Sequence, residues 1–198
     1  MTSAPHQGNL LAAVSLKPNL GSRPASGIPS LGYALLRDWQ CRLANHQAPM
    51  FRDGTGNHRQ GTLLPGIEDN PADHLRPLEL RPLPLSFWSW PGNLHTGPAI
   101  YLVMDQPAAP CGPLLLYIGE TGAAEQRWKG KHDCKDYLSA YREALHAAGL
   151  QPQLSIRFWM DVPVSSNARR QLEQTLIHRW LPAFNREVRR HWSTPFHH

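Results

Sequence analysis

Residues 99–119 read AIYLVMDQPAAPCGPLLLYIG, and the pattern of this segment is the clearest indication of the fold. It holds two apolar runs, 99–104 and 114–118, which are separated by a segment that contains three prolines and a glycine. Short apolar runs bounded by turn-forming residues are typical of strands. The stretch therefore predicts a hairpin of two antiparallel strands joined by an irregular loop.

The chain beyond the hairpin alternates between helical and extended patterns. Residues 123–131 have a helix-favouring composition, and residues 137–148 carry apolar side chains at helical spacing before Gly149, a residue type that commonly ends helices. Residues 154–160 alternate between two sets of side chains, which predicts a half-buried strand.

A last helix is predicted from an Asn167 cap to about residue 181, because Pro182 cannot continue it. The predicted element order is then β-β-α-α-β-α. The fold class is α+β, with a small three-stranded antiparallel sheet and flanking helices.

The first half of the chain is rich in proline and partly irregular. Residues 1–98 hold 12 of the 19 prolines, and residues 1–30 have the composition of a flexible arm. Residues 31–45 predict a helix with Ser30 as its cap. We expect residues 31–96 to form an extension that packs on a domain at 97–192, and residues 193–198 to form a tail.

Charge and cysteine content narrow the classes of function. The 198 residues carry a formal net charge of +5, and no apolar run is long enough to cross a membrane. Three widely spaced cysteines, Cys41, Cys111 and Cys134, do not describe a disulfide scaffold, so reduced thiols and a cytoplasmic location are expected. A cluster near the end of the chain suggests a polyanionic partner or a solvated helix face: Arg169, Arg170, Arg179, Arg186, Arg189 and Arg190.

Glu173 occupies an unexpected place in the last predicted helix. It lies within the apolar stripe that Leu176, Ile177 and Trp180 continue. Burial of an isolated carboxylate is costly, so such a group is usually paired, hydrogen-bonded or bound to a metal ion. The alternative is a glutamate at the edge of the stripe that reaches water or an arginine.

Two tyrosines lie inside the predicted hairpin strands. Tyr101 and Tyr117 fit core side chains whose hydroxyls find a partner, and Arg127 follows Tyr117 by ten residues. If the last helix packs on the hairpin, two phenols, a guanidinium and the Glu173 carboxylate converge. Such a set is suited to phosphodiester chemistry.

In this order, the tripeptides at 99–101 and 117–119, Arg127, Glu173 and Asn185 resemble the signature of the GIY-YIG nuclease superfamily. The resemblance covers about residues 97–190, and Ala99 replaces the first glycine of the motif. It implies the β-β-α-α-β-α domain and a metal-dependent endonuclease that cleaves a phosphodiester with water.

The resemblance also implies a role for each site residue. Glu173 would hold one Mg²⁺ or Mn²⁺ ion, and Arg127 would neutralise charge on the phosphoryl oxygens. Tyr101 and Tyr117 would orient or deprotonate the attacking water, with the choice between them open. Asn185 would be an orienting hydrogen-bond partner.

Further contacts are expected around this site. Lys131 or His132 would assist the base or contact a phosphate. Glu120 would pair with Arg127 or lie near the metal. The six clustered arginines would contact the DNA backbone.

The resulting expectation is an endonuclease acting on double-stranded or branched DNA, in repair, recombination or the cleavage of structured DNA. A restriction-type, sequence-specific endonuclease is the alternative within the same class. A nucleic-acid-binding module that keeps the fold without catalysis is the alternative from another class. An accidental motif, with Glu173 ion-paired and the tyrosines in the core, is the third.

Overall fold

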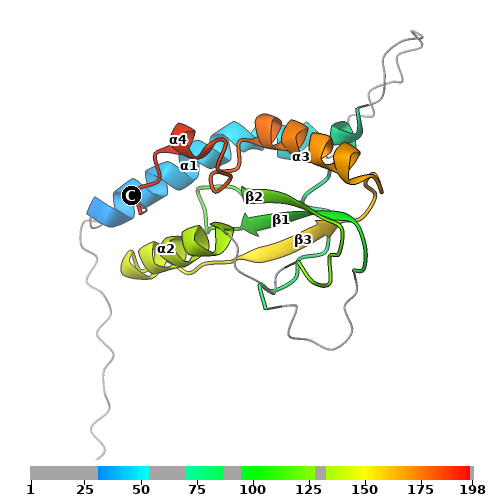
Figure 1. Cartoon of the computed structure of the whole chain (residues 1–198). Coiled ribbons are helices and arrows are strands. Elements are labelled where there is room, and N and C mark those ends of the chain that lie inside the picture. The colour runs from blue at the N-terminus through cyan, green and yellow to red at the C-terminus, as the bar shows by residue number, and fades with distance from the viewer. Residues whose placement is uncertain (1–30, 54–69, 87–94, 128–132, 197–198) are drawn as a thin grey trace, which may run out of the picture.

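The computed structural model describes residues 31–53, 70–86, 95–127 and 133–196. Its elements are, in chain order, α1 (Leu31–Asp53), the short 3₁₀ helix η1 (Pro71–His74), β1 (Ala99–Asp105), β2 (Leu114–Thr121), α2 (Asp133–Ala147), β3 (Ser155–Trp159), α3 (Ser166–Trp180) and α4 (Arg189–Trp192). The fold is α+β, as the sequence predicts (Figure 1).

The sheet has the strand order β2-β1-β3, with both neighbours antiparallel to β1. Tyr101 in the central strand stands opposite Gly119 of β2 and Phe158 of β3. The predicted hairpin and the third strand are therefore confirmed. This register places the two tripeptide motifs side by side.

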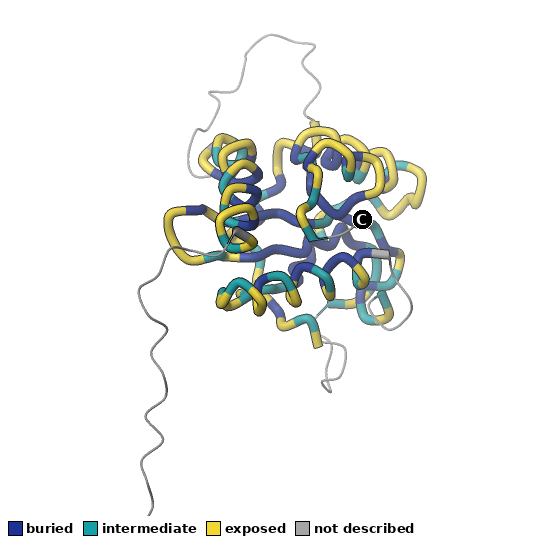
Figure 2. Tube along the Cα trace, turned by 90° about the vertical axis from the view of Figure 1, so that its left-hand side faces the viewer, coloured by how far each residue is buried: buried dark blue, intermediate teal, exposed yellow. Residues whose placement is uncertain are grey.

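Helices cover both faces of the sheet, so β1 is buried along its whole length. Tyr101 and Val103 face a core that α2 covers, whereas Ile100 and Leu102 face a second core that α3 covers. Figure 1 shows α2 and α3 on opposite sides of the strands, and Figure 2 shows the strands as the most buried part of the trace. The helix α1 packs on both α2 and α3, and Trp192 of α4 joins the core that α2 covers. The sheet is thus the middle layer of three.

The helix α1 is longer than predicted and continues through Pro49 to Asp53 instead of ending at residue 45. Its side chains enter both cores, with Trp39 in the first and Phe51 in the second. Tertiary packing at both ends thus stabilises a helix that continues through a proline. The expected cap Ser30 lies outside the described residues.

Three local predictions are wrong. Residues 123–127 form hydrogen-bonded turns and no helix, and residues 128–131 lie outside the described part of the chain. The strand β3 is covered on both faces, because α3 buries Trp159 and backbone carbonyls surround Arg157. The last helix begins at Ser166 after Ser165, so Asn167 lies inside it.

The expectation of reduced thiols is wrong for Cys41 and Cys111, which form a disulfide between α1 and the loop after β1. Their 70-residue separation gave no signal of this, because the contact depends on how α1 docks. Arg37 supports the docking by donating hydrogen bonds to the carbonyl oxygens of Ala108 and Ala109, both at 2.8 Å. Cys134 is buried and takes no part in the disulfide.

Among the described residues, no helix combines the length and apolar character that a membrane span requires.

Candidate active site

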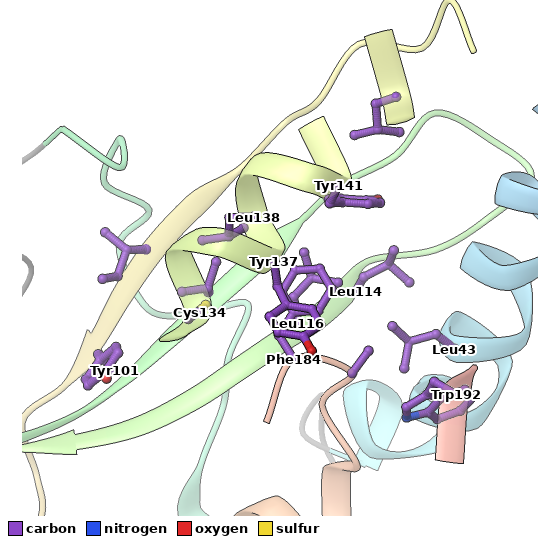
Figure 3. Close-up of a cluster of buried hydrophobic side chains, with 14 of the residues drawn as sticks. Leu43, Tyr101, Leu114, Leu116, Cys134, Tyr137, Leu138, Tyr141, Phe184 and Trp192 are labelled. Carbon is purple, nitrogen blue, oxygen red and sulfur yellow. The ribbon is translucent and has the colours of Figure 1, made fainter. Parts of the chain in front are cut away.

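The ring of Tyr101 lies against the backbone of Gly119, its partner across the hairpin. A Cβ atom at residue 119 would lie 2.3 Å from the Cζ and Oη atoms of Tyr101, and the ring is fully buried. Figure 3 shows Tyr101 at one end of the core that α2 covers. A side chain at residue 119 would therefore displace the tyrosine, which explains the glycine of the second motif.

Arg127 reaches Tyr101 from the turn that follows β2. Its Nε atom donates a hydrogen bond to Tyr101 Oη at 2.9 Å, and its guanidinium carbon lies 5.2 Å from the ring centroid. The turn is fixed to the start of β1, because Ala124 donates its N–H to the Gly97 carbonyl at 2.9 Å. The arginine is thus held by its backbone and by its side chain.

The two tyrosines stack with ring centroids 5.8 Å apart. Burial raises the pKa of Tyr101 above its ordinary value, and the nearby Tyr117 has a smaller effect in the same direction. Burial likewise raises the pKa of Tyr117 to about 12, although a hydrogen bond from Tyr101 and the charge of Arg127 act in the lowering direction. Both phenols keep their protons near neutral pH, and Arg127, Tyr101 and Tyr117 form a hydrogen-bonded chain.

Glu173 lies on α3 in the apolar stripe, where the neighbouring Leu172, Leu176 and Ile177 are buried. Its Oε1 atom accepts a hydrogen bond from the backbone N–H of Glu120 at 3.1 Å. Burial raises the pKa of Glu173 to about 7; the charges of Glu120 and Glu187 act in the same direction, while the Glu120 N–H and Arg127 act against it. The positive charge near Glu173 is therefore too small to offset the cost of burying its ionised carboxylate.

Asn185 is buried and bonds only to backbone in the described contacts. Its Oδ1 atom accepts from the N–H of Ile118 at 2.9 Å, and its Nδ2 atom donates to the Ile118 carbonyl at 2.8 Å. It therefore orients the strand β2 against the segment that follows α3.

The side chain of Glu120 does not pair with Arg127. It accepts hydrogen bonds from Arg169 Nε at 2.8 Å and from Arg170 Nε at 3.4 Å. Sequence reasoning missed this link. The available signal was the position of Arg169, one helical turn before Glu173 on the same face.

The six clustered arginines fall into two groups. Arg169 is buried against Glu120, Arg179 pairs with Asp73 at 2.5 Å, and the guanidinium of Arg189 lies 3.8 Å from the ring centroid of Tyr137. The second group is Arg170, Arg186 and Arg190, which are exposed, as Arg179 also is; within this group, Arg170 contacts Glu120 at 3.4 Å. Lys131 and His132 lie outside the described residues.

The described residues contain no group of three or more His, Cys, Asp or Glu side chains that could hold a metal ion. Glu173 offers a single carboxylate. Mg²⁺ is commonly bound through one or two carboxylates and keeps several waters, so a single half-buried carboxylate fits this ion. A cation would also relieve the penalty that raises the pKa of Glu173.

Comparison of the chain with protein-family models, with curated proteins and with solved structures finds no match. The side chains and their contacts are therefore the basis for a functional proposal.

Proposed function

We propose that this protein is a divalent-metal-dependent DNA endonuclease of the GIY-YIG type. The observation that carries the proposal is the position of Arg127. It donates to Tyr101, and its charge acts on the pKa of both Tyr117 and Glu173. Four side chains from two strands, a turn and a helix therefore share one electrostatic environment.

Arg127 is suited to stabilise the negative charge that builds up on the phosphoryl oxygens during hydrolysis. Its bond to Tyr101 fixes the plane of the guanidinium, so little reorganisation accompanies the reaction. Tyr101 is fully buried and acts by orienting Arg127 and Tyr117.

Tyr117 is the half-buried phenol of the pair and the one that can contact the attacking water. It accepts a hydrogen bond from Tyr101 and, with a pKa raised by burial to about 12, keeps its own proton at Oη. Tyr117 therefore positions the water. Glu173 would hold the metal ion, which supplies the charge that polarises the scissile phosphate and stabilises the leaving oxygen.

The exposed Arg170, Arg186 and Arg190 support contacts with a phosphate backbone. Backbone contacts select neither a sequence nor a branch. We favour structured DNA formed in repair or recombination as the substrate, and a restriction-type specificity is the alternative that the substrate panel below decides.

The test is cleavage of linear, nicked, flapped, four-way and supercoiled DNA with Mg²⁺ or Mn²⁺. Glu173→Gln and Arg127→Ala should each lower the cleavage rate by about 10²–10³-fold, because each removes charge that stabilises the transition state. Tyr117→Phe should lower it by about 10²-fold.

Matched controls lie on the exposed surface of α2: Glu143→Gln and Arg142→Ala should cleave at the wild-type rate. Equal cleavage by Glu173→Gln and the wild type would contradict the proposal. If the wild type binds DNA but cuts no substrate, the non-catalytic binding module is correct.

A further inference from the structure

Glu120, near the end of β2, is joined to α3 by its side chain as well as by its backbone. Its carboxylate contacts Arg169 at 2.8 Å and Arg170 at 3.4 Å. The Arg169 side chain is only 4% exposed, whereas that of Arg170 is 68% exposed. Arg169 is therefore the buried partner of Glu120, whereas Arg170 is open to solvent.

The guanidinium of Arg169 is fixed on a second side. Its Nη1 atom donates to the carbonyl oxygens of Pro163 and Val164, at 3.1 and 3.0 Å. These carbonyls belong to the segment that leads into α3. The N–H donors of a buried guanidinium need acceptors. A planar guanidinium that is held on two sides is a rigid support for the Glu120 carboxylate.

Glu120 in turn supports Glu173 through its backbone N–H, which lies 3.1 Å from Oε1 of that carboxylate. Arg169 and Glu173 are one helical turn apart, so both face the same end of β2. We propose that Arg169 is a positioning residue that acts through Glu120 to hold the Glu173 carboxylate at the edge of the sheet. This inference rests on the proposed role of Glu173 as the metal ligand.

Two other roles fit the contacts less well. A second carboxylate ligand at Glu120 is disfavoured, because each of its oxygens accepts from an arginine. A purely stabilising role is also disfavoured, because well-packed apolar side chains in place of a buried ion pair are often as stable or more so.

The test is hydrogen exchange of the Glu120 amide, measured by NMR on the full chain. The Ile118 amide on the same strand is the internal reference, because Asn185 holds it independently. Arg169→Gln should accelerate exchange at Glu120 about tenfold and leave Ile118 unchanged. Arg169→Lys keeps the cation and should restore part of the protection.

Two further variants complete the experiment. Glu120→Gln keeps the backbone N–H and should give the same local acceleration, including where Arg169→Gln does not fold. Arg42→Gln breaks an exposed ion pair with Asp38 on α1 and should change neither amide. Unchanged exchange at Glu120, or equal acceleration at both amides, would overturn the inference.

The Mg²⁺ concentration for half-maximal cleavage separates this inference from the proposed function. Arg169→Gln should raise it about tenfold, as loss of a group that supports a metal ligand does. If the wild type shows no metal-dependent cleavage while the exchange effect is local, the proposed function fails and the positioning contact stands. If cleavage depends on metal but Arg169→Gln has the wild-type requirement, the role of Arg169 fails alone.

Discussion

Side chains form hydrogen bonds with the backbone along the outer edge of β2 and so close this edge. Amide side chains do so over most of the strand, and a carboxylate does so near its end. Gln47 exchanges two hydrogen bonds with the backbone of Leu115, at 2.9 and 2.8 Å, and Asn185 does the same with Ile118. Glu173 instead accepts one bond from the N–H of Glu120. An amide both donates and accepts, whereas an ionised carboxylate only accepts.

This difference separates structure from chemistry along one strand. An amide at residue 173 would accept a hydrogen bond from the Glu120 N–H equally well. It would also avoid the cost of burying a charge, which raises the pKa of Glu173 to about 7. Closure of the edge therefore accounts for Gln47 and Asn185 but not for an acid at residue 173. Under the proposed function, the acid at residue 173 is there to bind a cation.

The largest expected effect comes from placing an acid at the amide part of the edge. Asn185→Asp should lower the free energy of unfolding by about 3 kcal/mol at pH 8, because a buried carboxylate cannot donate to the Ile118 carbonyl. Near pH 5 the loss should be smaller, since burial favours the neutral acid, which can donate and accept. Urea unfolding at the two pH values measures this, and a loss that does not depend on pH would contradict it.

A smaller effect of opposite sign is expected where an amide replaces the acid. Because burial raises the pKa of Glu173 from 4.5 to about 7, the folded chain keeps a proton in this range that the unfolded chain releases. The wild type therefore loses stability as the pH rises from 4.5 to about 7. Without divalent metal, Glu173→Gln should match the wild type near pH 4.5 and exceed it by about 1 kcal/mol at pH 8, a modest gain because the carboxyl is partly in water.

Urea unfolding of both proteins in EDTA gives the comparison. Glu143→Gln, which changes an exposed glutamate of α2, is the control and should follow the wild type at both pH values. A Glu173→Gln protein that is less stable than the wild type at pH 8 would mean that the acid is part of the closure of the edge.

The smallest effect is the response to metal. At pH 8, Mg²⁺ at a concentration equal to its dissociation constant should stabilise the wild type by about 0.4 kcal/mol, which is roughly 1 °C in Tm. Glu173→Gln should show no such gain. Thermal unfolding across a Mg²⁺ series measures the difference, and equal shifts in both proteins would place the binding of metal elsewhere.

The hairpin could be predicted from the sequence because its strands are local apolar runs bounded by prolines and glycines. The third strand could be predicted from the alternation of its side chains, but the burial of both its faces could not. Arg157 looks like a solvent-facing residue in the alternating pattern, yet it donates to the carbonyls of Pro77, Leu78 and Leu80, from a segment that is distant in sequence. Composition also favoured a helix at 123–131, whereas contacts with Gly97 set the turn over 123–127.

For the candidate site, the sequence predicts which residues lie near one another but not which contacts they make. Tyr101, Tyr117, Arg127 and Glu173 share one environment, as expected from their order in the chain. The burial of Tyr101 could not be predicted, because it depends on the register that sets its ring against Gly119. The partner of Glu120 also depends on tertiary packing.

The disulfide between Cys41 and Cys111 has a consequence for the unfolded chain. A crosslink between residues 70 positions apart reduces the conformational entropy of the unfolded ensemble, which is worth about 4 kcal/mol in the chain-entropy model. The disulfide also keeps the two parts of the chain covalently connected when a single peptide bond between the two cysteines is cut. A proteolytic cut there would leave α1 and its Gln47 covalently attached to the strand whose edge they close.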